Sequence, residues 1–159
     1  MPEVVRLRPM TQEEYDAYRA RSEGEYARQI ADSGQLDLEA AVKRSAVEFA
    51  ELLPDGLASP GMHFWTARLG DEEEPVGLGW VELRRRSSGV SAWIYDIQVE
   101  EGRRGEGLGR ALLEALHDAA RGLGATTMAL NVFGHNTAAI RLYDSLGYAV
   151  TAQQMKRDL

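Results

Sequence analysis

The sequence predicts a mixed α+β fold with α/β/α-like layers, in which helices flank a mixed, mostly antiparallel sheet, as a single domain over residues 1–159. The middle of the chain, from 63 to 99, contains three apolar segments joined by short polar loops, which is typical of an antiparallel meander. From residue 108 onward the apolar spacing changes to an alternation of helix and strand. The 159 residues are 44% hydrophobic, which suits one core of ordinary size.

The N-terminal elements are predicted from alternation and from capping signals. Apolar and polar residues alternate before Pro9, as in a strand. Thr11 and Glu14 have the spacing of a capping box, and Asp37 is a good N-cap for a following apolar stripe. A break near Gly24 in the first helix is left open. The expected elements are a strand at 4–8, a helix from 11 to 34 and a helix from 37 to 53.

The remaining elements follow from the same periodicities. Glycines at 124 and 147 are expected to end two helices. The expected strands are 63–69, 76–84, 91–99, 126–132 and 148–155, and the expected helices are 108–123 and 136–146. In the strand 91–99, Trp93, Tyr95, Ile97 and Val99 are expected to share one face.

Charge and composition exclude several classes of function. The formal net charge is −7, and an acidic surface repels phosphate backbones, which disfavours nucleic-acid binding. The absence of cysteine excludes thiolate metal sites and a covalent cysteine intermediate, and no metal is expected. We find no signal peptide and no apolar run that would span a membrane, so no membrane partner and a cytoplasmic location are expected.

A glycine-rich loop between a predicted strand and a predicted helix is the first candidate site. It consists of Arg104, Gly105, Glu106, Gly107, Leu108, Gly109 and Arg110. Helix N-termini leave backbone N–H groups unpaired, and glycines let several of them face one anion. Arg104 and Arg110 can add charge and forked donors. The loop therefore predicts a site for a phosphate or pyrophosphate, although a solvated glycine turn is the alternative.

Two other phosphate motifs do not fit this loop. The dinucleotide fingerprint requires glycine at the position that Arg110 occupies, and the Walker A loop ends in Gly-Lys-Ser/Thr, which is missing here.

Three motifs together resemble the GNAT superfamily of N-acetyltransferases. Arg104-x-x-Gly107-x-Gly109 is similar to its phosphate signature, and Ile97-x-Val99 precedes it where the family has its central strand. The second cofactor motif is matched by Asn136-x-x-Ala139-x-x-Leu142-Tyr143-x-x-x-Gly147-Tyr148. The N-terminal half is similar to the YycN-like bacterial acetyltransferases, in Leu7-x-Pro9-Met10, in Leu52 to Gly56 and in His63-x-Trp65.

The resemblance implies a sheet with a V-shaped splay that receives acetyl-CoA as co-substrate. The glycine loop would hold the pyrophosphate, and the pantetheine arm would pair with the strand at Ile97, Gln98 and Val99. Further contacts are implied for Asn131, Asn136, Ala138, Ala139 and Tyr143. The acetyl group would pass directly to an amine, without a covalent enzyme intermediate. Asn136 could equally serve only as a helix cap.

Tyr143 is the candidate general acid, because the family places a tyrosine there to protonate the departing thiolate. It is seven residues from Asn136, so both lie on one helix face. Asp96 is the candidate base, since a charge in an apolar strand needs a partner and burial raises its pKa. Glu82 and His63 are alternatives for this role. The simpler interpretation of Tyr143 is a core aromatic, and that of Asp96 is a carboxylate that pairs with an arginine or accepts backbone hydrogen bonds.

The acceptor is not identified by the sequence, and small-molecule and peptide amines both fit. A CoA-binding regulatory module without turnover is the alternative function, and transfer of a larger acyl group is left open. Tyr15, Tyr18 and Tyr26 either wall the acceptor pocket or pack their helix on the sheet. The resemblance also leaves a homodimer open.

Overall fold

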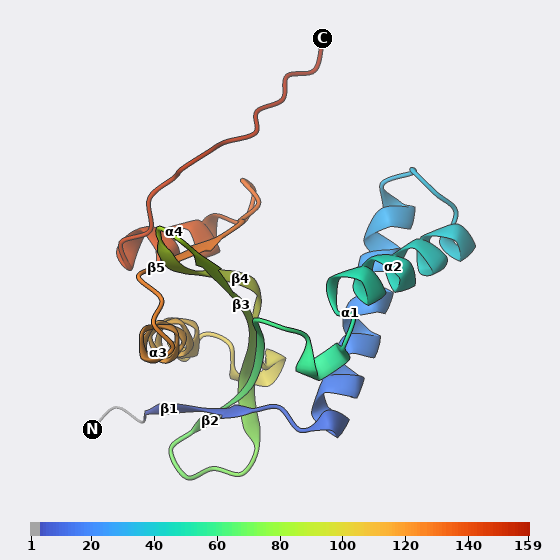
Figure 1. Cartoon of the computed structure of the whole chain (residues 1–159). Coiled ribbons are helices and arrows are strands. Elements are labelled where there is room, and N and C mark those ends of the chain that lie inside the picture. Colours follow the sequence, from blue (N-terminus) through green and yellow to red (C-terminus); the bar gives the residue numbers. More distant parts are fainter. Residues whose placement is uncertain (1–3) are drawn as a thin grey trace.

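The computed structural model describes residues 4–159 and shows one five-stranded sheet with helices on both faces (Figure 1). The strands follow the order β1-β2-β3-β4-β5, with antiparallel pairs from β1 to β4 and a parallel β4–β5 pair. This confirms the predicted mixed, mostly antiparallel sheet. The elements are β1 (Val5–Pro9), α1 (Gln12–Asp32), α2 (Leu38–Leu52), β2 (Met62–Leu69), β3 (Pro75–Arg86), β4 (Gly89–Val99), α3 (Leu108–Gly122), β5 (Thr127–Leu130) and α4 (Thr137–Ser145).

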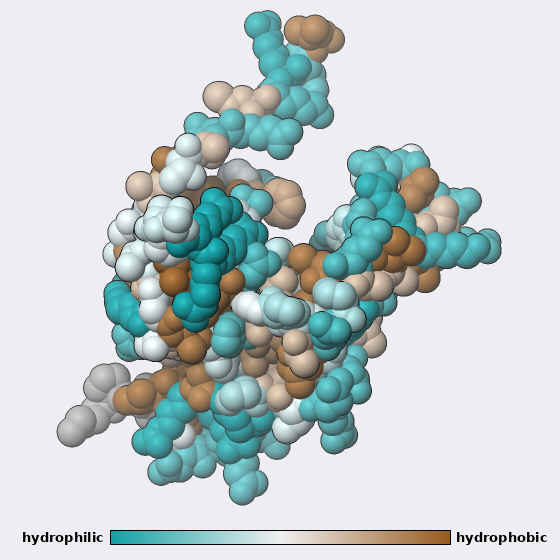
Figure 2. Space-filling model, viewed as in Figure 1, coloured by the Kyte–Doolittle hydropathy of each residue, from teal (hydrophilic) through white to brown (hydrophobic). Residues whose placement is uncertain are grey.

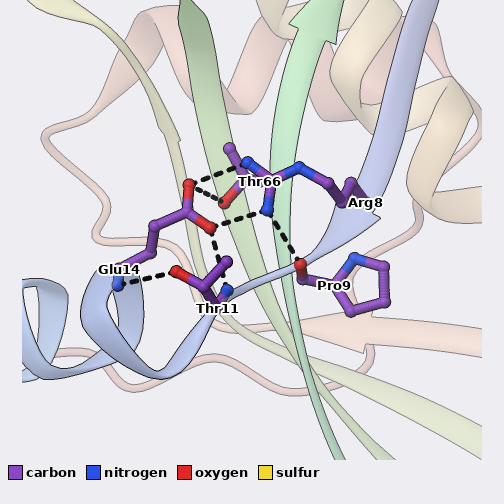
Figure 3. Close-up of polar contacts among 5 residues, drawn as sticks. All are labelled: Arg8, Pro9, Thr11, Glu14 and Thr66. Atoms are coloured by element: carbon purple, nitrogen blue, oxygen red, sulfur yellow. Dashed lines mark hydrogen bonds and ion pairs between the residues drawn. The ribbon is translucent and has the colours of Figure 1, made fainter.

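The start of α1 is tied to the edge of the sheet by a polar cluster (Figure 3). Thr11 and Glu14 form the predicted capping box, with distances of 3.1 and 2.8 Å. The guanidinium of Arg8 donates two hydrogen bonds to the Glu14 carboxylate, and the Thr66 hydroxyl donates a third. The bonds from Arg8 are the main cause that lowers the pKa of Glu14 to about 2. One carboxylate therefore caps the helix and joins it to β1 and β2.

Two apolar cores fill the two faces of the sheet. On one face α3 buries Leu112, Leu113 and Leu116 against β3 and β4. A Cβ atom at Gly79 would lie 2.8 Å from the Leu116 side chain, so the glycine allows the close approach of α3 to the sheet. On the other face α1 packs an aromatic cluster, which consists of Tyr15, Tyr18, Phe64 and Trp80.

The helix α2 lies against α1 and extends the α1 face outward (Figure 1). The hydroxyl of Ser45, which is 1% exposed, donates to the Glu23 carbonyl across this contact at 2.7 Å. Among residues 4–159, no helix is long and apolar enough to cross a membrane.

Two predictions about the elements need correction, and one open alternative is decided. The helix α1 is continuous through Gly24, so the break that was left open there does not occur. The strand β5 ends at Leu130, two residues earlier than predicted. The predicted strand 148–155 is wrong for this chain, since these residues are in no strand and 149–159 are all exposed. Alternation alone cannot form a strand, because a strand needs a neighbour for its backbone hydrogen bonds.

Candidate active site

The central feature of the site is the separation of two parallel strands. Residues Ser91–Ile94 of β4 pair with Thr127–Leu130 of β5, and beyond these residues the pairing stops. A hollow of about 160 Å³ lies where the strands diverge. It is lined from β4 by Ile94, Tyr95, Asp96 and Ile97, from the end of β5 by Leu130, Asn131, Val132 and Phe133, and from α4 by Asn136 and Tyr143. The sheet thus shows the V-shaped splay expected from the resemblance.

A bulge in β4 places two successive side chains on the α1 side of the hollow. In the β3–β4 ladder, Trp80 pairs with Asp96 and Val81 pairs with Ile94, so Tyr95 is the extra residue. Tyr95 stacks on Trp80 with ring centroids 4.6 Å apart, while Asp96 bonds to Tyr18 of α1. The prediction that Tyr95 shares one face with Ile97 and Val99 is therefore wrong, because Ile97 and Val99 pack toward the α3 core, whereas Trp93 stays on the side of Tyr95, where both adjoin Glu82.

Asp96 is partly buried and is held from two sides. The Tyr18 hydroxyl donates to Oδ2 of Asp96 at 2.6 Å, and the Gln98 amide donates to the same oxygen at 2.7 Å. Burial raises the pKa of Asp96 above its ordinary value, and the bonds from Tyr18 and Gln98 partly oppose this shift. The alternative of an arginine partner is wrong, since the carboxylate accepts from the neutral side chains of Tyr18 and Gln98, whereas the alternative of backbone donors is met in part by a bond from Ile97. A carboxylate with a raised pKa in a cleft has the properties of a general base.

Tyr143 faces the same hollow from α4. Its side chain is half-buried, and burial raises the pKa of its phenol, with a smaller contribution from the negative charge of Asp96. The Tyr143 hydroxyl thus keeps its proton at neutral pH, as a general acid must. Tyr148 lies behind it, with ring centroids 5.5 Å apart, and the Tyr148 hydroxyl is 2.7 Å from Nε2 of His117 on α3.

The glycine loop forms the turn into α3. Gly105 and Gly107 have φ angles of +83° and +77°, a backbone conformation that residues with a Cβ rarely adopt. Gly107 is the N-cap of α3 and supplies no side-chain acceptor for the first N–H groups of the helix. These N–H groups are therefore available to an anion at the positive end of the helix dipole. The geometry of the loop fits a phosphate or pyrophosphate group.

The side chains of the loop have separate roles. Arg104 is exposed, and its Nε donates to the Val99 carbonyl at 3.5 Å, which ties the loop to the end of β4. Arg110 instead donates to the Ser145 hydroxyl of α4. Glu106 is paired with Arg103, and Leu108 is buried in the α3 core. Only the backbone of Leu108, and not its side chain, can therefore contact a phosphate.

The predicted contacts on α4 lie beside the hollow. Oδ1 of Asn136 accepts from the Ala139 N–H at 3.3 Å, so the capping role of Asn136 is shown, and its position in the lining leaves it available to a ligand. In the first turn of α4, Ala138 is exposed and Ala139 is half-buried. Asn131 follows β5 and lines the hollow.

The other two candidate bases do not line the hollow. His63 stacks on Trp65, with ring centroids 5.4 Å apart, and burial lowers its pKa. The carboxylate of Glu82 is bound by Arg84 and by the Tyr95 hydroxyl. The described residues 4–159 contain no group of three or more His, Asp or Glu side chains that could hold a metal ion.

The α1 side of the hollow is aromatic. Tyr15 and Tyr18 pack edge-on against Phe64, so two of the three helix tyrosines pack the helix on the sheet, and Tyr18 also reaches the site. Tyr26 packs on Phe49 of α2. Figure 2 shows a deep notch between the α1–α2 arm and the α4 side of the molecule, with apolar residues along the arm.

Sequence reasoning missed Tyr18 as the partner of Asp96 and the bulge at Tyr95. It also missed Val132 and Phe133, which extend the lining beyond β5. One signal for Tyr18 was present in the sequence. A buried carboxylate requires a hydrogen-bond donor, and the tyrosines of α1 carry hydroxyl groups that can donate.

The chain belongs to the acetyltransferase (GNAT) family, whose profile matches residues 12–148. It is 35% identical to an uncharacterized N-acetyltransferase, YdgE of Bacillus subtilis, over 96% of this chain and 97% of the relative. The crystal structure of the putative acetyltransferase YycN from the same organism is similar, with a TM-score of 0.86, 34% identity and coverage of 98% and 99%. A putative acetyl transferase from Pyrococcus furiosus, with a TM-score of 0.65 and 24% identity, shows the same fold.

Proposed function

We propose that this acetyltransferase moves an acetyl group from acetyl-CoA directly to an amine, with Asp96 as general base and Tyr143 as general acid. The observation that carries the proposal is the placement of these two groups in the lining of one hollow, from opposite walls of the splay. The pKa of each is raised by burial, and the charge of Asp96 raises the pKa of Tyr143 further, as expected for two groups close in space.

The proposed chemistry needs one thioester and one amine. The thioester supplies the acetyl group when the co-substrate is bound. The glycine loop holds the pyrophosphate through the N–H groups at the start of α3, and Ile97 to Val99 offer backbone groups to the pantetheine arm. These assignments rest on the open splay beside β4 and on the uncapped start of α3.

Asp96 accepts the proton that the amine loses as its nitrogen bonds to the carbonyl carbon. Tyr143 donates its phenolic proton to sulfur as the carbon–sulfur bond breaks. The products are the acetylated amine and free CoA thiol, and solvent returns Asp96 and Tyr143 to their starting states. The anionic carboxylate of Asp96 thus takes a proton from the amine, and the neutral phenol of Tyr143 gives a proton to the departing sulfur.

The test is release of thiol from acetyl-CoA with a panel of peptide and small-molecule amines. We expect release with at least one amine class, together with saturable acetyl-CoA binding. The absence of Cys in the chain means that a thiol reagent reports only CoA. Acetyl-CoA binding without release for any amine would favour a regulatory CoA-binding module. If a larger acyl-CoA were the better donor, the transferred group would be that larger acyl group rather than acetyl.

A further inference from the structure

The β1–β2 edge of the sheet carries three arginines on one face. Val5 and Leu7 pack toward the α3 core, so the alternate residues Arg6 and Arg8 point to the α1 face. In the β1–β2 ladder Arg6 lies directly opposite Arg68, which therefore shares this face. Like charges at directly opposite positions repel each other, so this pair is stabilised by any partner of negative charge.

Only one of the three arginines has a carboxylate partner among residues 4–159. Arg8 is bound by Glu14, as Figure 3 shows. Arg6 and Arg68 form no ion pair within the described residues, although Arg68 is half-buried. The Nε atoms of Arg68 and Arg8 are buried and have no hydrogen-bond partner in the same part of the chain. A buried donor on a charged group is costly without an acceptor, so this edge is suited to an anion.

A cavity of about 280 Å³, the arginine pocket, lies beside these side chains. It is lined by Arg6, Leu7 and Arg8 of β1, by Arg68 of β2 and by residues 70–72 of the β2–β3 turn. It shares no lining residue with the hollow of the candidate active site. The arginine pocket is therefore a separate site, and it is larger than one phosphate group requires.

The β2–β3 turn contributes two carboxylates to the lining. Oε2 of Glu72 accepts a hydrogen bond from Arg103 at 3.1 Å, so its charge is already paired. Asp71 is exposed and forms no ion pair with the residues that the structure describes. It can accept a hydrogen bond from a hydroxyl group of a ligand, whereas it would repel a second anionic group. The lining thus suits one compact anionic group attached to a body that carries hydroxyl groups.

We infer that the arginine pocket binds a phosphate monoester of a small polyol. Since Arg6 and Arg68 are directly opposite, their two charges lie close together, as do the two negative charges of a phosphate monoester at neutral pH. A dicarboxylate spreads its charges along a carbon chain and fits this arrangement less well. Each guanidinium can donate from Nε and from a terminal nitrogen to two phosphate oxygens. The hydroxyl groups of the polyol would donate to Asp71.

The test is a titration of nitrogen-15-labelled protein with glycerol phosphate at an ionic strength of about 0.15 M, which screens exposed charges. We expect saturable shifts of the Gly70 and Asp71 amide signals and of the Arg68 Nε–H signal. Arg6→Gln and Arg68→Gln should each raise Kd at least about tenfold. Arg86→Gln is the matched control, because it removes the same charge from an exposed position at the end of β3. Equal Kd values for all three variants would overturn the site.

Thermal unfolding distinguishes a ligand site from a cluster of solvated arginines. Glycerol phosphate should raise the Tm of the wild-type chain and of Arg86→Gln, but not that of Arg6→Gln. Without ligand, Arg6→Gln should melt no lower than wild type, because it relieves the like-charge pair. A full thermal response of Arg6→Gln to the ligand would refute the site. A response to succinate as large as that to glycerol phosphate would refute the phosphate assignment.

The glycine loop is a second place where a phosphate can bind, so the two sites are observed separately. In Gly107→Val, any shift of the Leu108 and Gly109 amides should be lost, while the shifts of Gly70 and Asp71 remain. Loss of both sets would overturn the independence of the arginine pocket. The shifts at Gly70 do not depend on turnover, so a chain that fails to release thiol from acetyl-CoA would still show them.

Discussion

The two walls of the splay are built very differently. On the β4 side, Tyr15, Tyr18 and Trp80 are 2%, 3% and 5% exposed and pack in one aromatic cluster with Phe64. On the β5 side, α4 has no buried residue, and Phe133 is 75% exposed. The dense wall carries Asp96, and the open wall carries Tyr143.

The proposed reaction gives a physical reason for this difference in packing between the two walls. A base needs a fixed geometry and a controlled pKa, which the buried bonds of Asp96 supply without a ligand. The open wall lacks its own packing, so a ligand in the splay can complete it. We therefore expect acetyl-CoA to stabilise the open wall more than the dense one, and each substitution below changes one side of this comparison.

Gly107→Val should have the largest effect, since it changes the glycine loop at the start of α3, where the proposed pyrophosphate site lies. A β-branched residue at a φ of +77° is strained, and its side chain disturbs the N–H groups that face the phosphates. We expect acetyl-CoA binding by calorimetry to weaken by at least about 10³-fold, with an unchanged circular dichroism spectrum. Gly102→Ala is the matched control, because Gly102 has ordinary φ and open space around its Cβ position. Normal affinity in Gly107→Val would refute the phosphate role of the loop.

Asp96→Asn removes the charge from the dense wall. We expect kcat to fall by about 10²–10³-fold, which is the usual range for loss of a general base, with little change in acetyl-CoA binding. In the unsubstituted enzyme, kcat/KM should fall as pH falls through the pKa of Asp96, which burial raises above the ordinary value for aspartate. This acid limb should be absent from the variant. An unchanged limb would assign the base elsewhere.

Tyr143→Phe tests the open wall. We expect kcat to fall by about 10–100-fold, because the thiolate then leaves without its proton donor. Tyr148→Phe is the matched control, since it makes the same change in the adjacent ring, whose hydroxyl contacts His117 rather than the hollow. We expect Tyr148→Phe to keep kcat within a few-fold, on the order of 1 kcal/mol. Equal losses in the two variants would point to packing rather than proton donation.

Tyr18→Phe asks whether the dense wall positions the base. The Tyr18 hydroxyl stabilises the charged form of Asp96 and so lowers its pKa, and its loss should raise the pKa of Asp96 further. The acid limb of kcat/KM should therefore move to higher pH, while kcat on the plateau falls only a few-fold, or about 1 kcal/mol. A lower plateau with an unmoved limb would mean that Tyr18 only packs.

The parts of this site that could be predicted are those with local signals. The glycine loop and the Asn136 cap are each predicted from residue spacing at the start of a single helix, α3 for the loop and α4 for the cap. Each lies where the sequence places it. The Tyr18–Asp96 bond joins residues far apart in the chain, and no local pattern encodes it. The bulge at Tyr95 depends on the register with β3. The C-terminal strand was wrong for the related reason that pairing is decided by a neighbour rather than by alternation.

Glu14→Gln should have the smallest effect on the reaction, because it loosens the anchor of the dense wall without entering the hollow. Glu14 has a lowered pKa, so its stabilising contribution is complete above its ordinary pKa of about 4.5 and is lost as the pH falls toward about 2. Since the Arg8 and Glu14 side chains are 34% and 28% exposed, solvent screening reduces the contribution to about 1–2 kcal/mol. Denaturant titrations should show this loss at pH 7 and almost none near pH 2. If Glu14→Gln also moved the acid limb as Tyr18→Phe does, α1 would be a flexible support, and the contrast between the two walls would fail.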